Sequence, residues 1–157
     1  MRAGRFAAAV AGAAGATGLV AAAALAATPT KGVYEGQTEQ KNAPDHGVVL
    51  RVDKQHRVVR FSVDWRAFCK KDDRFWDAGT QIKNPKNEPV GTFHDHGSYT
   101  SSTPDGFKGK ITLTLDGRFT DRTHPAGDRK ATVKVFNPKG KRVNTCSVKT
   151  HWRAGPA

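Results

Sequence analysis

The sequence predicts an all-β protein: a single antiparallel β-sandwich or barrel of about eight short strands, preceded by an N-terminal signal peptide. Three observations predict this fold class. Apolar and polar residues alternate with period two in several short segments, turn-forming residues separate these segments at intervals of roughly 8 to 15 residues, and no helical periodicity follows the N-terminal apolar run. Such a pattern is typical of antiparallel sandwiches and barrels.

Residues 1–26 have the features of a secretory signal peptide. Arg2 and Arg5 precede a run of alanine, glycine, valine and leucine, which ends in a small-x-small Ala-Leu-Ala cleavage pattern. A retained membrane anchor is the alternative, because the run is nearly long enough to span a bilayer. Alanine and glycine make the run only weakly apolar, so we expect cleavage, a short tail over residues 27–31, a β-domain over residues 32–157 and no stable membrane span in the secreted protein.

Strict alternation predicts three strands in the first half of the domain. Residues 32–38 and 48–52 form the first two. The third covers residues 57–65, where alternate side chains are apolar, and a turn at residues 53–56 joins it to the second strand as an antiparallel hairpin.

Turn residues organise the second half. Asp116-Gly117 lies between alternating apolar positions, which predicts a hairpin turn. The turn at residues 137–140 predicts that the strand beginning at Val133 pairs with the final strand, which begins at Cys146. We expect irregular structure or loops in residues 69–79, 98–106 and 121–128, and the two prolines of residues 84–89 exclude a central strand there.

The chain has two cysteines, Cys69 and Cys146. Successive residues of a strand face opposite sides, and we call the side that a residue faces its parity; both cysteines have the parity of the apolar residues in their strands. Continuing the alternation of the third strand past Trp65 places Cys69 on the apolar side, and Cys146 shares a side with Val148 and Trp152. We therefore predict a disulfide, which the chain-entropy model values at roughly 4 kcal/mol for a loop of this length. Two reduced core cysteines are the alternative, and export to an oxidising compartment favours the bond.

The sequence contains no serine-nucleophile elbow, no phosphate-binding loop and no dinucleotide fingerprint. His94 and His96 are two residues apart, so on a strand both imidazoles face one side and could ligate one metal ion. A third ligand would have to come from Asp95, His46 or His124. Because only two ligands are assured locally, we expect no cofactor and no tightly bound transition metal, and a metal-dependent hydrolase is the weakest function class.

The full chain carries 26 basic and 14 acidic residues, a net charge of +12, and removal of residues 1–26 leaves +10. Basic side chains with outward parity, together with those of the last turn, predict one candidate polyanion-binding face: Lys134, Lys139, Lys141, Arg142, Lys149 and Arg153. Such a face attracts wall teichoic acids, acidic glycans or nucleic acid. Few aromatic residues share it, so we expect charge-driven binding without sequence-specific recognition of nucleic acid. A merely solvated basic surface is the alternative.

The first strand carries the pattern Gly32-x-Tyr34-x-Gly36-x-Thr38-x-Gln40, and the last carries Cys-Ser followed by Trp-x-Ala. With the leader and the mid-chain cysteine, these motifs resemble a group of secreted actinobacterial-type β-proteins of uncharacterised function. The resemblance spans the mature chain and departs from the group in the proline-rich middle and in the His-Asp-His segment. It implies a compact extracellular β-domain and supplies no catalytic residues.

These observations together predict a secreted, non-catalytic β-domain, extracellular or associated with the cell wall, that binds an anionic cell-wall polymer or glycan. An extracellular domain whose partner is a protein is the second function class. Clustered basic residues on one face would favour the first class, and an exposed apolar patch would favour the second.

Overall fold

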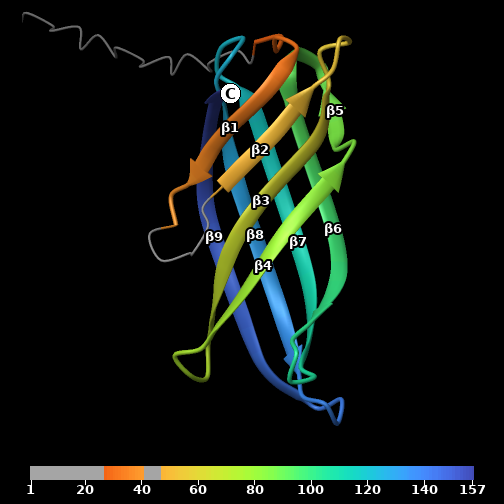
Figure 1. The fold of residues 1–157 in the computed structure, drawn as a ribbon, viewed down its shortest axis with the longest axis vertical. Coiled ribbons are helices and arrows are strands. Elements are labelled where there is room, and N and C mark those ends of the chain that lie inside the picture. Colours follow the sequence, from red (N-terminus) through yellow and green to blue (C-terminus); the bar gives the residue numbers. More distant parts are fainter. Residues whose placement is uncertain (1–26, 41–46) are drawn as a thin grey trace, which may run out of the picture.

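The computed structural model describes residues 27–40 and 47–157; the expected signal peptide lies outside the described residues. One nine-stranded antiparallel sheet curls into a barrel-like closed sheet (Figure 1), which confirms the predicted all-β class. No helix among the described residues is long and apolar enough to cross a membrane. The strands are β1 (Gly32–Thr38), β2 (Gly47–Val52), β3 (Val58–Cys69), β4 (Phe75–Lys83), β5 (Lys86–Glu88), β6 (Thr92–Ser102), β7 (Lys108–Phe119), β8 (Pro125–Phe136) and β9 (Arg142–Pro156), with a 3-10 turn at Pro89–Gly91.

The strands are ordered β4-β3-β2-β1-β9-β8-β7-β6-β5, and β3 also pairs with β9 beyond the ends of the shorter β1 and β2. The hairpin of β2 and β3 and the pairing of β8 with β9 were both predicted and are confirmed. In the described sheet no backbone pairing links β4 to β6, and side chains join these two strands instead. The hydroxyls of Thr80 on β4 and Tyr99 on β6 are hydrogen-bonded at 2.8 Å. The amide of Asn87 on β5 binds the start of β3: it accepts from the backbone N–H of Val58 at 2.7 Å and donates to the Val58 carbonyl at 2.9 Å.

The core lies inside the curled sheet and contains large aromatic side chains. Phe61 and Trp152 pack edge-to-face with ring centroids 5.0 Å apart, and Phe93 lies 5.9 Å from Trp152. Trp76 on β4 is buried against β7, where a Cβ at Gly109 would lie 2.6 Å from its ring.

The predicted hairpin turn at Asp116-Gly117 is wrong. Strand β7 runs through both residues, paired with β6 on one side and β8 on the other. The inward position of Gly117 is directly opposite Phe93, and a Cβ there would clash with the Phe93 ring. The glycine makes room for an aromatic side chain in the core and does not turn the chain.

Three segments expected to be irregular contain strand residues. After Cys69 the chain turns only through residues 70–74, and β4 begins at Phe75. Strand β6 extends to Ser102 and β8 begins at Pro125, inside segments expected to be polar loops. Cross-strand packing decides strand formation more than intrinsic propensity does, so partners distant in sequence extend these polar strands. The short β5 lies between two prolines. It is at the edge of the sheet, as expected, because proline is excluded from central strands.

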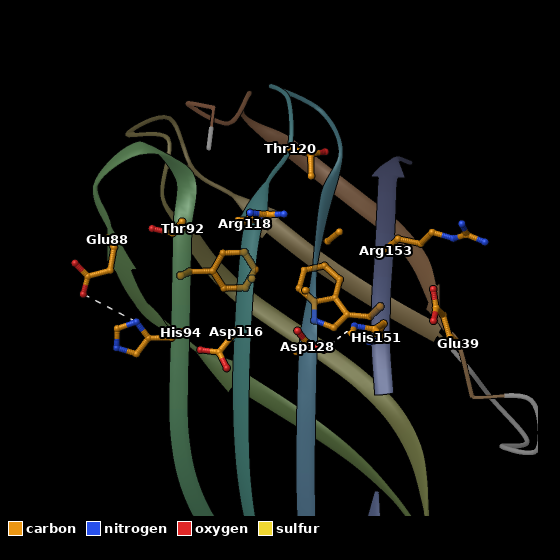
Figure 2. Close-up of a pocket in the computed structure, with 15 residues that line it drawn as sticks. Glu39, Glu88, Thr92, His94, Asp116, Arg118, Thr120, Asp128, His151 and Arg153 are labelled. Carbon is orange, nitrogen blue, oxygen red and sulfur yellow. Dashed lines mark ion pairs between the residues drawn. The ribbon is translucent and has the colours of Figure 1, made fainter. Parts of the chain in front are cut away.

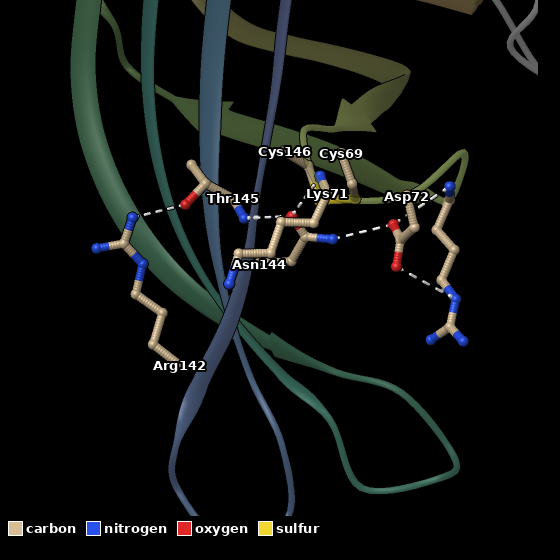
Figure 3. Close-up of a disulfide and its surroundings, with 8 residues drawn as sticks. Cys69, Lys71, Asp72, Arg142, Asn144, Thr145 and Cys146 are labelled. Carbon is tan, nitrogen blue, oxygen red and sulfur yellow. Dashed lines mark hydrogen bonds and ion pairs between the residues drawn. A yellow bond between two sulfur atoms is a disulfide. The ribbon is translucent and has the colours of Figure 1, made fainter.

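The predicted disulfide is present: Cys69 at the end of β3 is bonded to Cys146 on β9 (Figure 3). The two residues are direct partners in the β3–β9 pairing, with Cα atoms 3.7 Å apart. Asn144 reinforces the junction, because its amide donates to Asp72 Oδ1 at 3.0 Å and accepts from the Lys71 backbone N–H at 3.3 Å. Covalent and hydrogen bonds therefore tie the β3–β4 loop to the last strand.

Candidate polyanion-binding face

The four long strands β6 to β9 are in continuous register, so their outward side chains form rows across the sheet. One row consists only of hydroxyl-bearing residues, each directly opposite the next and each exposed: Ser98, Thr112, Thr132 and Ser147. We call this the hydroxyl row.

A pair of lysines lies on each side of the hydroxyl row. Lys110 is directly opposite Lys134, and Lys130 is directly opposite Lys149; all four are exposed. Each pair is two residues along the strands from the hydroxyl row, so the two pairs lie about 14 Å apart. None of the four makes an ion pair within the part of the chain that the structure describes. We refer to the four lysines and the hydroxyl row as the lysine face.

Like charges directly opposite each other on neighbouring strands are destabilising. No acidic residue occupies an outward position in the hydroxyl row or in either lysine row; the nearest outward carboxylates of these four strands, Asp116 and Asp128, lie in the next row beyond Lys130. An anionic ligand would therefore relieve repulsion that the folded protein otherwise retains.

The structure places Lys134 and Lys149 within the lysine face. Of the other predicted residues, Lys139 and Lys141 lie in and beside the turn between β8 and β9, and Arg142 begins β9. The guanidinium of Arg142 donates to Thr145 Oγ1 at 2.7 Å (Figure 3). These three residues extend the positive charge to one end of the barrel.

Sequence reasoning missed Lys110 and Lys130. Lys110 alternates with the buried Ile111, so parity alone could have placed it outward. Lys130 could be assigned only once β8 was known to begin at Pro125, which is before the predicted start at Val133.

Arg153 is not part of the lysine face. It has outward parity on β9, as predicted, but the position between it and Lys149 is occupied by His151. His151 ends a different row across the four strands: His94, Asp116, Asp128 and His151. The predicted continuous basic face is therefore interrupted by two carboxylates before it reaches Arg153.

This acidic row lies in a hollow of about 870 Å³ (Figure 2). His151 Nδ1 is 2.6 Å from Asp128 Oδ1, and His94 Nδ1 is 4.0 Å from Glu88 Oε1. The hydrogen bond and charge of Lys86, whose Nζ lies 2.8 Å from Glu88, hold the pKa of the Glu88 carboxyl below its usual value. The hollow thus carries paired acid and histidine groups, in contrast to the unpaired lysines of the neighbouring rows.

His94 and His96 have the same parity on β6, as the sequence predicted; this parity is the outward one, and they lie opposite Asp116 and Thr114. The proposed third ligands do not join them: Asp95 has the inward parity of β6, and His124 pairs with Asp121 at 2.8 Å in the β7–β8 turn. His46 lies outside the described residues. Among the residues described, no group of three or more histidine, cysteine, aspartate or glutamate side chains could hold a metal ion.

Among the residues that the structure describes, one basic side chain is buried inside the barrel: Arg129, which is 1% exposed. Its guanidinium stacks on Trp65 at 4.4 Å and donates to Thr80 Oγ1 at 3.4 Å. Burial lowers the pKa of Arg129 to about 10, despite the opposing effects of Tyr99 and Asp64. Arg129 packs as part of the interior and is not accessible to a polymer on the outer face.

Comparisons of the chain with protein-family models, with curated proteins and with solved structures find no match. Function must therefore be inferred from the geometry of the surface itself.

Proposed function

We propose that the protein is a secreted, non-catalytic binding domain that holds an anionic extracellular or cell-wall polymer on its lysine face. One observation carries this proposal: Lys110 faces Lys134 and Lys130 faces Lys149 across neighbouring strands, with no acidic residue among them. Retaining two like-charge pairs costs stability, and binding a polyanion offsets that cost.

Two further features support a secreted protein. The Cys69–Cys146 disulfide is of the kind that persists in oxidising compartments. The first 26 residues have the charge, the apolar run and the cleavage pattern of a signal peptide.

The spacing of the charges favours a polymer over a small anion. The two lysine pairs lie about 14 Å apart, and Lys139, Lys141 and Arg142 continue the charge towards the β8–β9 turn. A chain of linked anionic groups can contact several of these sites at once, which raises its avidity over that of one isolated group.

The experiment measures affinity for an isolated wall teichoic acid over a salt series, with wild type and with Lys134→Glu/Lys149→Glu. The matched control is Lys54→Glu/Lys83→Glu, which makes the same change in net charge at exposed positions away from the face. We expect wild type and control to bind with affinity that falls log-linearly as salt rises, because bound counterions are released. The face variant should lose binding; equal binding by the face variant would refute the proposal.

A further inference from the structure

The lysine face continues into a pair of exposed aromatic side chains. Phe68 on β3 and Phe75 on β4 are directly opposite each other and are 49% and 50% exposed. Arg66 lies over the Phe75 ring at 3.6 Å and is bonded to Asp77 at 2.7 Å, which braces that ring from one side. Both phenylalanine rings expose apolar surface to water, and a ligand packed on the two rings would gain free energy by burying that surface.

The pairing of β3 with β9 joins this aromatic pair to the hydroxyl row. In the β3–β9 pairing, Phe68 is directly opposite Ser147, which is the last residue of the hydroxyl row. A continuous outward row therefore crosses six strands: Phe75, Phe68, Ser147, Thr132, Thr112 and Ser98. Five strand spacings make this row about 24 Å long, and the two lysine pairs flank its hydroxyl part.

We infer that the polymer on the lysine face is an acidic polysaccharide; this inference rests on the proposed function and specifies its ligand. A sugar ring has an apolar C–H face that packs on an aromatic ring, hydroxyls that hydrogen-bond with serine and threonine, and, in uronic or sulfated sugars, anionic groups that pair with lysine. The row offers these three kinds of contact in adjacent positions. A polyphosphate would use only the lysines.

A single-stranded nucleic acid is less well matched. Its bases need aromatic platforms repeated along the strand, whereas both aromatic side chains lie at one end of the row and the other four positions carry hydroxyls.

The test compares three probes of similar length and charge, at one low salt concentration: oligogalacturonate, polyphosphate and oligo(dT). The variant Phe68→Leu/Phe75→Leu keeps apolar side chains but removes the rings, and Phe68→Tyr/Phe75→Tyr keeps the rings. The control Val33→Ala/Val49→Ala alters two other exposed apolar residues, which are 45% and 38% exposed.

We expect the leucine variant to bind oligogalacturonate at least tenfold more weakly than wild type, and polyphosphate within twofold. The tyrosine and control variants should bind both probes as wild type does. Unchanged melting temperatures verify that each variant is folded; if the leucine variant is destabilised, upfield shifts of the sugar C–H protons on binding to wild type provide the same test.

The outcomes separate the two claims. If wild type binds polyphosphate but not oligogalacturonate, or if the leucine variant loses no sugar affinity, the inference is wrong and the proposed function stands. If oligo(dT) binds tighter than oligogalacturonate and loses affinity in the leucine variant, the ligand class is a nucleic acid instead. If wild type binds none of the three probes, the proposed function itself fails.

Discussion

Lys130 on β8 lies directly opposite Lys149 on β9, and neither ammonium group has a carboxylate partner among the described residues. A single substitution at this pair is expected to change the stability of the fold and the affinity for a polyanion in opposite directions.

We predict that Lys149→Glu stabilises the protein while weakening polyanion binding. The new glutamate would face Lys130, and replacing a like-charge pair by an opposite-charge pair raises the free energy of unfolding by about 0.2 to 1 kcal/mol. Chemical denaturation measures stability, and titration with a polyanion measures affinity. Lys83→Glu is the control, because Lys83 faces Arg60 on the β3–β4 pair: it should give a similar gain in stability and leave binding unchanged. A loss of stability in Lys149→Glu would contradict the account of the pair.

The disulfide between Cys69 and Cys146 closes a sequence separation of 77 residues. We predict that Cys69→Ser/Cys146→Ser lowers the free energy of unfolding by about 4 kcal/mol, mainly because the unfolded chain regains loop freedom. Thiol titration of the unfolded, unreduced wild type should find no free thiol. A double-serine variant with an unchanged melting temperature would show that the bond does not stabilise the fold.

Among the described residues no carboxylate forms an ion pair with the buried Arg129 guanidinium, and burial lowers its pKa to about 10. A folded-state pKa below the unfolded value means that the charged form destabilises the fold, by about 3 kcal/mol for this difference. This cost applies in full below pH 10 and falls as the pH rises from 10 towards the higher pKa of the unfolded state. Replacing the arginine would also remove its stacking on Trp65, worth about 2 kcal/mol.

We therefore predict that Arg129→Met raises the free energy of unfolding by about 1 kcal/mol, equally at pH 6 and pH 9. Denaturant unfolding at the two pH values measures this gain. A variant less stable than wild type by 2 kcal/mol or more would mean that the contacts of Arg129 outweigh the cost of burying its charge.

Gly117 lies opposite Phe93 in the core and not in a turn. We predict that Gly117→Ala destabilises the protein by about 1 to 3 kcal/mol, the usual cost of overpacking, and that Gly117→Ala/Phe93→Leu recovers part of the loss. Gly140, which has a positive φ of 77° and open space around its Cβ position, is the contrasting site. There Gly140→Ala acts through backbone strain, so the Phe93 change should give no recovery.

Parity predicted much of the fold from the sequence alone. The alternation around Phe61 and Trp152 identified β3 and β9, and it placed Cys69 and Cys146 on the same side, where they are bonded. The β8–β9 hairpin followed from the turn at residues 137–140, and Lys134 and Lys149 have the outward orientation that parity predicted.

Other features depend on contacts that the local sequence does not show. Asp116-Gly117 has the composition of a turn, and only the presence of Phe93 on a neighbouring strand explains why the chain continues straight. The hydroxyl row requires the register of four strands, and its continuation into Phe68 requires the pairing of β3 with β9. The sequence could indicate a basic surface, but not which charges lie side by side.

The most direct test of the central claim is the salt dependence of polyanion binding by wild type and by Lys134→Glu/Lys149→Glu. The account predicts a log-linear loss of affinity with salt for wild type, and a slope shallower by about 1 to 2 for the variant, together with much weaker binding at low salt. Wild-type binding that is absent at low salt, or a variant with the same slope and affinity as wild type, would contradict it.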